Sequence, residues 1–457
     1  MASRLLFGQF ARAERLSQWL QQRFTSAGLF VVCGMLATGI FSIDTRRTLA
    51  FQVFAVLLVL LVIAWLGLRY SKLPTLTLQR YLPDNGNINQ PCHYQLVIKN
   101  PHAQPLTDLW LHDTLLTILP DYDEFSRHPD PDAARRHWLD RRIGFPHWRA
   151  LLRHKRGAET APVAVSDIPA YSERTLNLTL QPLRRGYLRF EQITLLRPDP
   201  LGLMQRIRHY PLPDNLLILP QRYPVPIPAL AGQRRYQPGG LQAATSHGDA
   251  LEFKSLRDYR PGDPPRRIHW RSFAKTGHPI VKEYQEEYCA RQALVLDTFL
   301  ENRDPAQFEA AISTAASLLS QFDTFDSIID MLFIGQQAFH FSAGRGEMTR
   351  QRLLEIVACA EPATSDRAFV QLHRHVQASS RLLSGCICLL LSTDANRLAL
   401  INDLRRQGIS THALVLEETA TGPVTAGVNY LRPSRLAQDL ATLNLQADPA
   451  PRHLHRA

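Results

Sequence analysis

The chain has 457 residues, with 52 Lys and Arg against 41 Asp and Glu, which gives a formal net charge of +11 at pH 7. This length is sufficient for two or three domains with buried cores, and the six scattered cysteines exclude a small disulfide-rich secreted protein and favour a reducing compartment. The basic charge favours an anionic partner, which is anionic lipid, nucleic acid or an acidic protein, without choosing among them.

The first 70 residues have the composition of a membrane anchor. Residues 1–26 mix arginines with large apolar side chains and predict an amphipathic leader that lies on the membrane surface. Residues 27–70 contain two uncharged runs, which predict a two-helix transmembrane hairpin. Seven Lys and Arg flank the hairpin and two lie at its tip, so both ends are expected in the cytoplasm. A cleaved signal peptide is the alternative, but no A-x-A site follows the first run.

Residues 74–222 contain short runs in which apolar and polar residues alternate, and these runs predict a β-sandwich. A basic insertion at 121–160 interrupts them, with Trp138, Phe145 and Trp148 among nine Lys and Arg. Such a segment suits anionic lipid or, less well, nucleic acid, and it is also typical of a solvated excursion. Its four histidines do not follow the spacing of zinc ligands.

The C-terminal half begins with a linker at 223–247, followed by a charged and aromatic segment at 248–288. Over 289–446, continuous apolar runs alternate with amphipathic helical patterns, which predicts an open, mostly parallel α/β sheet. Ligands of such sheets bind at the carboxyl ends of the strands, where Asp297 and Asp394 are the candidates. The tail at 447–457 is expected to be disordered.

Segment 248–288 reads GDALEFKSLRDYRPGDPPRRIHWRSFAKTGHPIVKEYQEEY, with eight Lys and Arg against seven Asp and Glu. Asp263 followed by two prolines predicts the start of a helix that ends at Gly277. Within that helix Arg267, Arg271 and Lys275 would form one basic stripe, with a loop before it and an edge strand after it. The stripe either faces an acidic partner or belongs to an internal ion-pair network at a domain junction.

The same segment resembles the signature of a bacterial family, the domain of unknown function fifty-eight. The matching residues are Glu252, Phe253, Leu256, Arg257, Tyr259, Gly262, Asp263, Arg266, Ile268, Trp270, Val281, Tyr284 and Glu287. Further upstream, Arg184, Arg185, Gly186, Asp199, Pro200, Gly202 and Leu203 are similar to two other elements of the family. The paired N-terminal helices also fit, so the resemblance covers most of the chain. The Phe273-Ala274-Lys275 stretch and the 121–160 insertion depart from it.

The resemblance implies that the C-terminal domain is von Willebrand factor A-like, with a Rossmann-like open sheet. Domains of that kind often hold Mg²⁺ through a D-x-S-x-S motif and a later aspartate. Asp297 and Asp394 match two of those ligands, while Phe299 and Glu301 replace both serines. No cofactor is therefore expected, and Mg²⁺ at Asp297 and Asp394 is only the alternative.

The resemblance also implies a MoxR-type AAA+ ATPase as partner and, as a second possible partner, a transglutaminase-like membrane protein. The expected function is a multi-pass adaptor or assembly factor of the bacterial inner (cytoplasmic) membrane, not an enzyme, with the bulk of the chain in the cytoplasm. Its expected docking residues are Glu252, Arg257, Tyr259, Asp263, Arg266, Arg267, Trp270, Arg271 and Lys275. The alternatives are a Mg²⁺-dependent binding or hydrolytic module and nucleic-acid or anionic-lipid binding through 121–160.

Overall fold

The computed structural model divides the chain into two compact units, Met1–Pro220 and Gln221–Ala457. The structure describes residues 4–41, 48–70, 73, 75–127, 136–226, 253–263, 265, 268–284, 290–299, 304–321, 327–334, 338–343, 347–363, 367–418 and 427–443. Most of the predicted linker at 223–247 and the whole predicted tail at 447–457 lie outside these residues.

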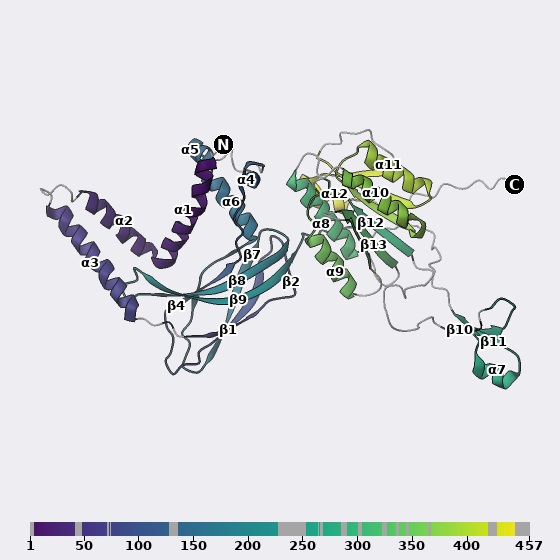
Figure 1. Ribbon diagram of the computed structural model, residues 1–457, viewed down its shortest axis with the longest axis horizontal. Helices are drawn as coiled ribbons and strands as arrows, with labels where there is room; N and C mark the ends of the chain where they lie inside the picture. Colours follow the sequence, from purple (N-terminus) through teal and green to yellow (C-terminus); the bar gives the residue numbers. More distant parts are fainter. Residues whose placement is uncertain are drawn as a thin grey trace. The chain divides into compact units, whose positions relative to one another are not determined.

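The first unit begins with three helices, α1 (Arg4–Arg23), α2 (Ser26–Phe41) and α3 (Thr48–Tyr70). Among the described residues, one helical stretch, Leu49–Arg69, is long and apolar enough to cross a bilayer, and α2 is apolar but shorter. The two apolar helices contact each other, since a Cβ at Gly39 would lie 3.3 Å from the Phe54 ring. Figure 1 shows α1, α2 and α3 as three successive rods at one end of this unit.

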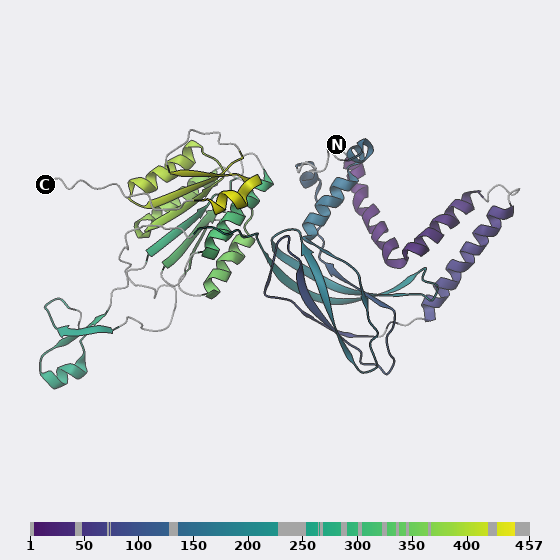
Figure 2. The same ribbon diagram turned by 180° about the vertical axis from the view of Figure 1, so that it is seen from behind.

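Helix α1 packs against the basic insertion, which folds into α4 (Tyr122–Arg127), α5 (Trp138–Ile143) and α6 (Phe145–Arg156). A small apolar core joins α1, α4 and α6 and consists of Phe10, Phe125, Trp148 and Leu152. The Arg149 guanidinium also lies 3.4 Å from the Glu14 carboxylate. Figures 1 and 2 both show α6 running beside α1. The interpretation of the insertion as a solvated excursion is therefore wrong for α4 and α6, because their aromatic side chains are buried against α1.

Two sheets follow in this unit, and one buried core contains side chains from both. In strand order, the first sheet holds β1 (Thr77–Tyr81), β3 (Cys92–Lys99), β7 (Glu173–Pro182) and β5 (Ala158–Thr160). The second holds β2 (Asn85–Asn87), β9 (Gln205–Leu219), β8 (Gly186–Pro198), β4 (Leu109–Leu115) and β6 (Val163–Val165). Inward and outward positions alternate along β3, as its sequence pattern predicts. Strand β9 pairs with β8 along nearly its whole length, from Gln205 to Ile218.

A buried ion pair lies within the core between these strands. The Arg80 guanidinium donates two hydrogen bonds to the Asp113 carboxylate, at 2.7 and 3.0 Å, and one to the Leu212 carbonyl at 2.8 Å. The Tyr94 hydroxyl donates to Asp113 at 2.9 Å, and the Phe190 ring packs under the guanidinium. Burial and the neighbouring carboxylate raise the pKa of Tyr94 well above its ordinary value, so the phenol stays protonated.

The turn between β8 and β9 contacts the chain where α1 ends and α2 begins. Asp199 fixes this turn by accepting hydrogen bonds from the backbone N–H groups of Leu201 and Met204, at 3.0 and 2.6 Å. Thr25, between α1 and α2, donates its backbone N–H to the Leu203 carbonyl at 3.1 Å. A Cβ at Gly28 would lie only 1.8 Å from that same carbonyl oxygen. Glycine at position 28 is therefore required for the close approach of α2 to the turn.

Replacing Gly28 by alanine is expected to lower the free energy of unfolding of the first unit by about 1–3 kcal/mol, because the added methyl group meets fixed backbone. The matched control is Gly8→Ala in α1, where a Cβ meets nothing within 4 Å and helix propensity favours alanine by up to about 1 kcal/mol. Thermal unfolding of both full-length variants in mild detergent checks this. Equal midpoints for the two variants would contradict the assigned contact.

The second unit contains a six-stranded sheet that is parallel except for one edge strand, as the alternating pattern predicts. Its strands, in order across the sheet, are β14 (Ala338–Ala343), β13 (Ser327–Ile334), β12 (Ala290–Leu296), β15 (Gly385–Leu390), β16 (Ser410–Leu416) and β17 (Val428–Leu431). Its longer helices are α8 (Pro305–Gln321), α9 (Glu347–Ala358), α10 (Arg367–Ser379) and α11 (Ala395–Arg406), and a short α12 (Leu436–Ala441) closes the fold. Figures 1 and 2 show helices on both faces of this sheet. Because helices cover both faces of the sheet, its central strands are apolar at nearly every position.

Candidate functional site

The signature segment forms a small module of two strands and one helix. Strand β10 (Phe253–Asp258) pairs antiparallel with β11 (Ile280–Tyr284), and α7 (Trp270–Thr276) lies between them in the chain. The prediction of a loop before the helix is wrong, since residues 253–258 form a strand. The predicted start of the helix directly after Asp263 is also wrong, because α7 begins at Trp270, after an isolated bridge between Ile268 and Val281. Of the predicted stripe, Arg271 and Lys275 lie on α7, and Arg267 lies outside the described residues.

Asp263 is an ion-pair partner within the module instead of a helix cap. Its two carboxylate oxygens accept hydrogen bonds from the two terminal nitrogens of the Arg257 guanidinium, at 2.7 and 2.8 Å. The backbone N–H of Arg260 donates to the same carboxylate at 2.9 Å. These hydrogen bonds, with those from Arg257 first, lower the pKa of Asp263 to about 2. Two of the expected docking residues, Arg257 and Asp263, thus neutralise each other and hold the turn that contains Gly262, whose φ is +107°.

The tip of the module exposes aromatic and basic side chains on α7. Trp270 has 62% of its surface exposed and Phe273 has 37%, and their rings contact edge to face with centroids 6.0 Å apart. Arg271 and Lys275 are exposed on the same short helix, which contains no acidic residue. The structure thus brings Trp270, Arg271 and Lys275 together, and it adds Phe273, which sequence reasoning missed. The i, i+3 spacing of Trp270 and Phe273 is the signal that could have identified it.

Among the other expected docking residues, the structure describes Arg257, Tyr259 and Asp263, and these three do not lie on α7. Tyr259 is partly buried, and its backbone N–H donates to the Pro279 carbonyl at 3.0 Å, where it closes the strand pair. Glu252, Arg266 and Arg267 lie outside the described residues. The candidate docking site is therefore the exposed surface of α7, defined by Trp270, Arg271, Phe273 and Lys275, which we call the α7 tip.

The Arg257–Asp263 pair predicts how the module responds to acid. Because the pKa of Asp263 is lowered from 3.8 to about 2 in the fold, the pair stabilises the module above about pH 4. That contribution is lost as the pH falls from about 4 to about 2. Selective ¹³C labelling of aspartate in the full chain, with Asp263→Asn to assign the signal, follows the titration. A midpoint near the ordinary value of 3.8 would contradict the pair.

The carboxyl end of the parallel sheet brings together both metal candidates of the sequence, with a guanidinium between them. Arg397, near the start of α11, donates from Nε to Asp297 Oδ2 at 2.5 Å and from Nη1 to Asp394 Oδ2 at 2.6 Å. Its Nη2 donates to the Phe299 carbonyl at 3.1 Å. Asp297 is fully buried and also accepts the backbone N–H groups of Phe299 and Leu391, each at 3.0 Å. Sequence reasoning found both aspartates but not the arginine.

This arrangement does not fit a Mg²⁺ site. Burial raises the pKa of Asp297, and the Arg397 guanidinium and the two backbone donors oppose that shift by favouring the carboxylate. Asp394 serves as the cap of α11, because it accepts the backbone N–H of Arg397 at 2.8 Å. The Arg397 guanidinium is thus the cation that neutralises both carboxylates, and a metal ion at this position would have to displace it. Among the described residues, no group of three or more His, Cys, Asp or Glu could hold a metal ion.

Removing the guanidinium is expected to be strongly destabilising. Arg397→Ala leaves the Asp297 carboxylate buried without its cation, which costs on the order of 3–5 kcal/mol. Arg397→Lys keeps the charge but lacks the planar set of donors that reaches both aspartates, so we expect an intermediate loss. The control is Arg406→Ala on the same helix, where 81% of the arginine side chain is exposed. Thermal unfolding, together with amide hydrogen exchange in β12 and β15, checks the expected order of stability of the three variants. An Arg397→Ala protein as stable as the control would contradict it.

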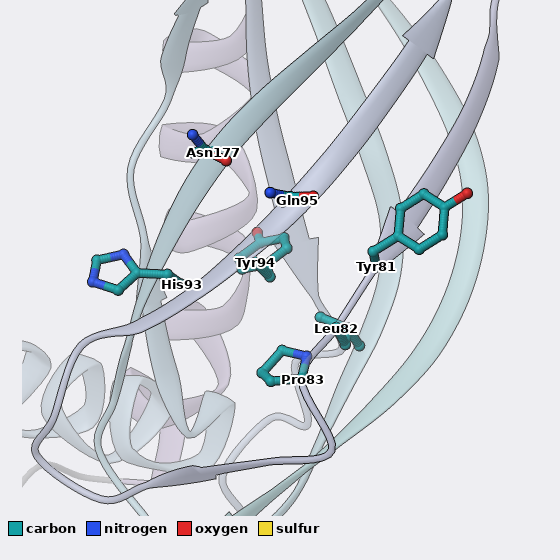
Figure 3. A pocket seen from close by; sticks show the side chains of 7 residues that line it. All are labelled: Tyr81, Leu82, Pro83, His93, Tyr94, Gln95 and Asn177. Carbon is teal, nitrogen blue, oxygen red and sulfur yellow. The ribbon is translucent and has the colours of Figure 1, made fainter.

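A groove of about 490 Å³ on the first unit is a further candidate. It lies beside β1 and β3, and Figure 3 shows side chains from both strands around it. The lining residues are Tyr81, Leu82, Pro83, His93, Tyr94, Gln95 and Asn177. These seven residues offer hydroxyl, amide and imidazole groups but no carboxylate, guanidinium or ammonium group. The groove therefore lacks the paired acid and base or the activated nucleophile that would define a catalytic site.

The fold and these sites define a mixed α/β chain of several parts with an exposed signature module. Residues 255–407 match the family model described as "Protein of unknown function DUF58". This matched segment belongs to the family, and it contains most of the module and the sheet as far as α11. The "Uncharacterized protein YeaD" of Bacillus subtilis (strain 168) is 23% identical over 197 residues, which is 42% of this chain and 47% of that relative. The match thus spans about half of the length of the relative.

Two solved structures are similar to parts of the chain. The manganese-loaded Plasmodium vivax TRAP protein matches 35% of this chain and 74% of its own, with 11% identity and a TM-score of 0.27. The CARDB domain of a Pyrococcus furiosus protein matches 32% of this chain and 97% of its own, with 9% identity and a TM-score of 0.15.

Proposed function

We propose that this protein is a membrane-anchored adaptor or assembly factor that acts with a MoxR-type AAA+ ATPase through protein contacts. The observation that carries the proposal is the α7 tip, where Trp270 is 62% exposed beside Arg271 and Lys275. Tryptophan and arginine are the residues most often found at the energetic centre of protein interfaces. An exposed tryptophan contributes little to the fold that carries it, so its position at the tip favours a contact with another molecule.

The charge of the α7 tip selects the kind of surface that it fits. Two cations without an acidic residue on α7 favour an acidic groove or patch on the partner. The Arg257–Asp263 pair is internal to the module and positions the turn, so these two residues support the tip without forming its contact surface. The transglutaminase-like membrane protein is a second partner that the same surface would suit.

The anchor in this proposal is the pair α2 and α3. The stretch Leu49–Arg69 supports it by length and composition, and only 6% of its most apolar window is buried within the protein. In the proposed arrangement α2 and α3 form a transmembrane hairpin in the inner membrane of a bacterium. The two sheets of the first unit then form a β-sandwich in the cytoplasm, and the six-stranded sheet is a von Willebrand factor A-like domain without a metal ion.

Reversing the charge of the α7 tip is expected to abolish partner binding without loss of folding. The variant is Arg271→Glu/Lys275→Glu in the full chain, and Trp270→Ala is a second variant that removes the aromatic contact. Both variants should bind an acidic partner with at least tenfold lower affinity, since a central aromatic or arginine contact contributes roughly 2 kcal/mol or more to binding. The measurement is affinity purification in mild detergent with and without ATP, followed by mass spectrometry.

The matched control is Arg352→Glu/Arg374→Glu, which changes the charge by the same amount at exposed positions on α9 and α10. The proposal requires that a AAA+ ATPase co-purifies with the wild-type chain and with this control. Retention of the ATPase by Arg271→Glu/Lys275→Glu would exclude the α7 tip as the docking site. A wild-type preparation without any AAA+ ATPase in either nucleotide state would overturn the adaptor function itself.

A further inference from the structure

Helix α1 has two faces with different environments. Its inner face packs on the insertion, with Phe10 only 4% exposed and Glu14 only 8% exposed. Its outer face carries Arg12, Arg15, Leu16, Trp19 and Arg23, which stand at positions i, i+3, i+4, i+7 and i+11 on one side of the helix and are all exposed. Leu16 is 58% exposed and Trp19 is 52% exposed, so two large apolar side chains lie among three arginines. We call these five residues the α1 outer stripe.

The α1 outer stripe is held at the base of the apolar helices. Only Phe24 and Thr25 separate the end of α1 from the start of α2. The Gln21 carbonyl accepts a hydrogen bond from Gln205 Nε2 at 2.9 Å, and Phe24 forms a bridge with Met204 in the β8–β9 turn. The stripe therefore has a fixed place beside α2 and cannot turn away from whatever covers the apolar helices.

The exposed side chains of α2 and α3 indicate which kind of environment surrounds these two helices. Phe30, near the start of α2, is 80% exposed, and further exposed apolar side chains follow along α2 and at the start of α3, at Leu36, Ile40 and Leu49. At the edge of such a surface, the composition of the stripe is that of a membrane interface. Arginine stems lie along acyl chains while the guanidinium groups reach phosphate, and tryptophan favours the headgroup level.

We propose that the α1 outer stripe is a binding surface for anionic phospholipid headgroups, with Trp19 inserted at the interface and Arg12, Arg15 and Arg23 on the phosphates. This inference rests on the proposed membrane anchor and adds to it a preference for lipid charge. Arginine binds phosphate by paired hydrogen bonds, and the negative potential of an anionic leaflet adds a charge-dependent attraction. The inner face is already occupied by α4 and α6, so α1 is fixed between the insertion and the bilayer.

The test uses the full chain in lipid nanodiscs whose phospholipids carry bromine on the acyl chains near the headgroup. Bromine quenches tryptophan emission on contact, so Trp19 should be quenched in discs of brominated phosphatidylglycerol. Trp19→Phe is expected to lose part of the quenched emission, whereas Trp270→Phe on α7 should lose none. Arg12→Gln/Arg15→Gln/Arg23→Gln should remove the difference in quenching between brominated phosphatidylglycerol and brominated phosphatidylcholine.

Three outcomes would overturn the inference. If brominated lipid removes the same amount of tryptophan emission from the wild-type chain and from Trp19→Phe, the stripe faces water. Equal quenching of the wild-type chain in both lipids would show that the stripe does not distinguish lipid charge. Binding of a labelled RNA oligonucleotide to the full chain, lost in the triple glutamine variant, would assign the stripe to nucleic acid. Carbonate extraction keeps this result separate from the anchor: a chain released from membranes overturns the anchor, and a retained chain with unquenched Trp19 overturns only the lipid surface.

Discussion

The contact on which the second unit depends is the guanidinium of Arg397 between two carboxylates. It joins the end of β12 through Asp297, the residues after β15 through the shared Leu391 bond, and the start of α11 through Asp394. The end of β12 therefore meets, at one buried charge, two elements whose contacting residues lie 94 and 100 positions further along the chain. The same contact decides the chemistry of this edge, since a cation from the chain itself neutralises the two oxygen groups that would otherwise suit a divalent metal ion.

Buried arginine–aspartate pairs recur in both units, and each joins two strands or a strand and a helix. Arg80 contacts Asp113 between two sheets, and Arg291 contacts Asp330 on neighbouring parallel strands. Desolvation makes such pairs weak contributors to net stability, while the loss of one partner is costly. They therefore penalise any register in which the charges do not meet. The Arg257–Asp263 pair is more exposed and acts only within its own turn.

The parts of the fold that follow from local patterns could be predicted from the sequence. Alternation identified β3, and continuous apolar runs identified the parallel strands, because both patterns reflect burial directly. The pattern of Asp263 and two prolines misplaced the start of α7, since the bridge from Ile268 to Val281 depends on a residue thirteen positions away. The helix α10 was missed although Phe369, Leu372 and Val376 have helical spacing and are buried. Arg397 could not be found, because an arginine within a helix resembles a surface residue until the fold is known.

The packing of α1 changes what the basic insertion can do. Its aromatic residues Phe145 and Trp148 contact Phe10 of α1, so they form a core and not a platform on which bases could stack. Trp138 on α5 remains exposed beside Arg141 and Arg142. Outside the insertion, two further tryptophans are exposed beside cations, Trp19 on α1 and Trp270 on α7. One adjoins the apolar helices and the other belongs to a module that contains no apolar helix. The adaptor that we propose requires two such surfaces, and their different surroundings are the physical reason why we propose lipid for the first and a protein for the second.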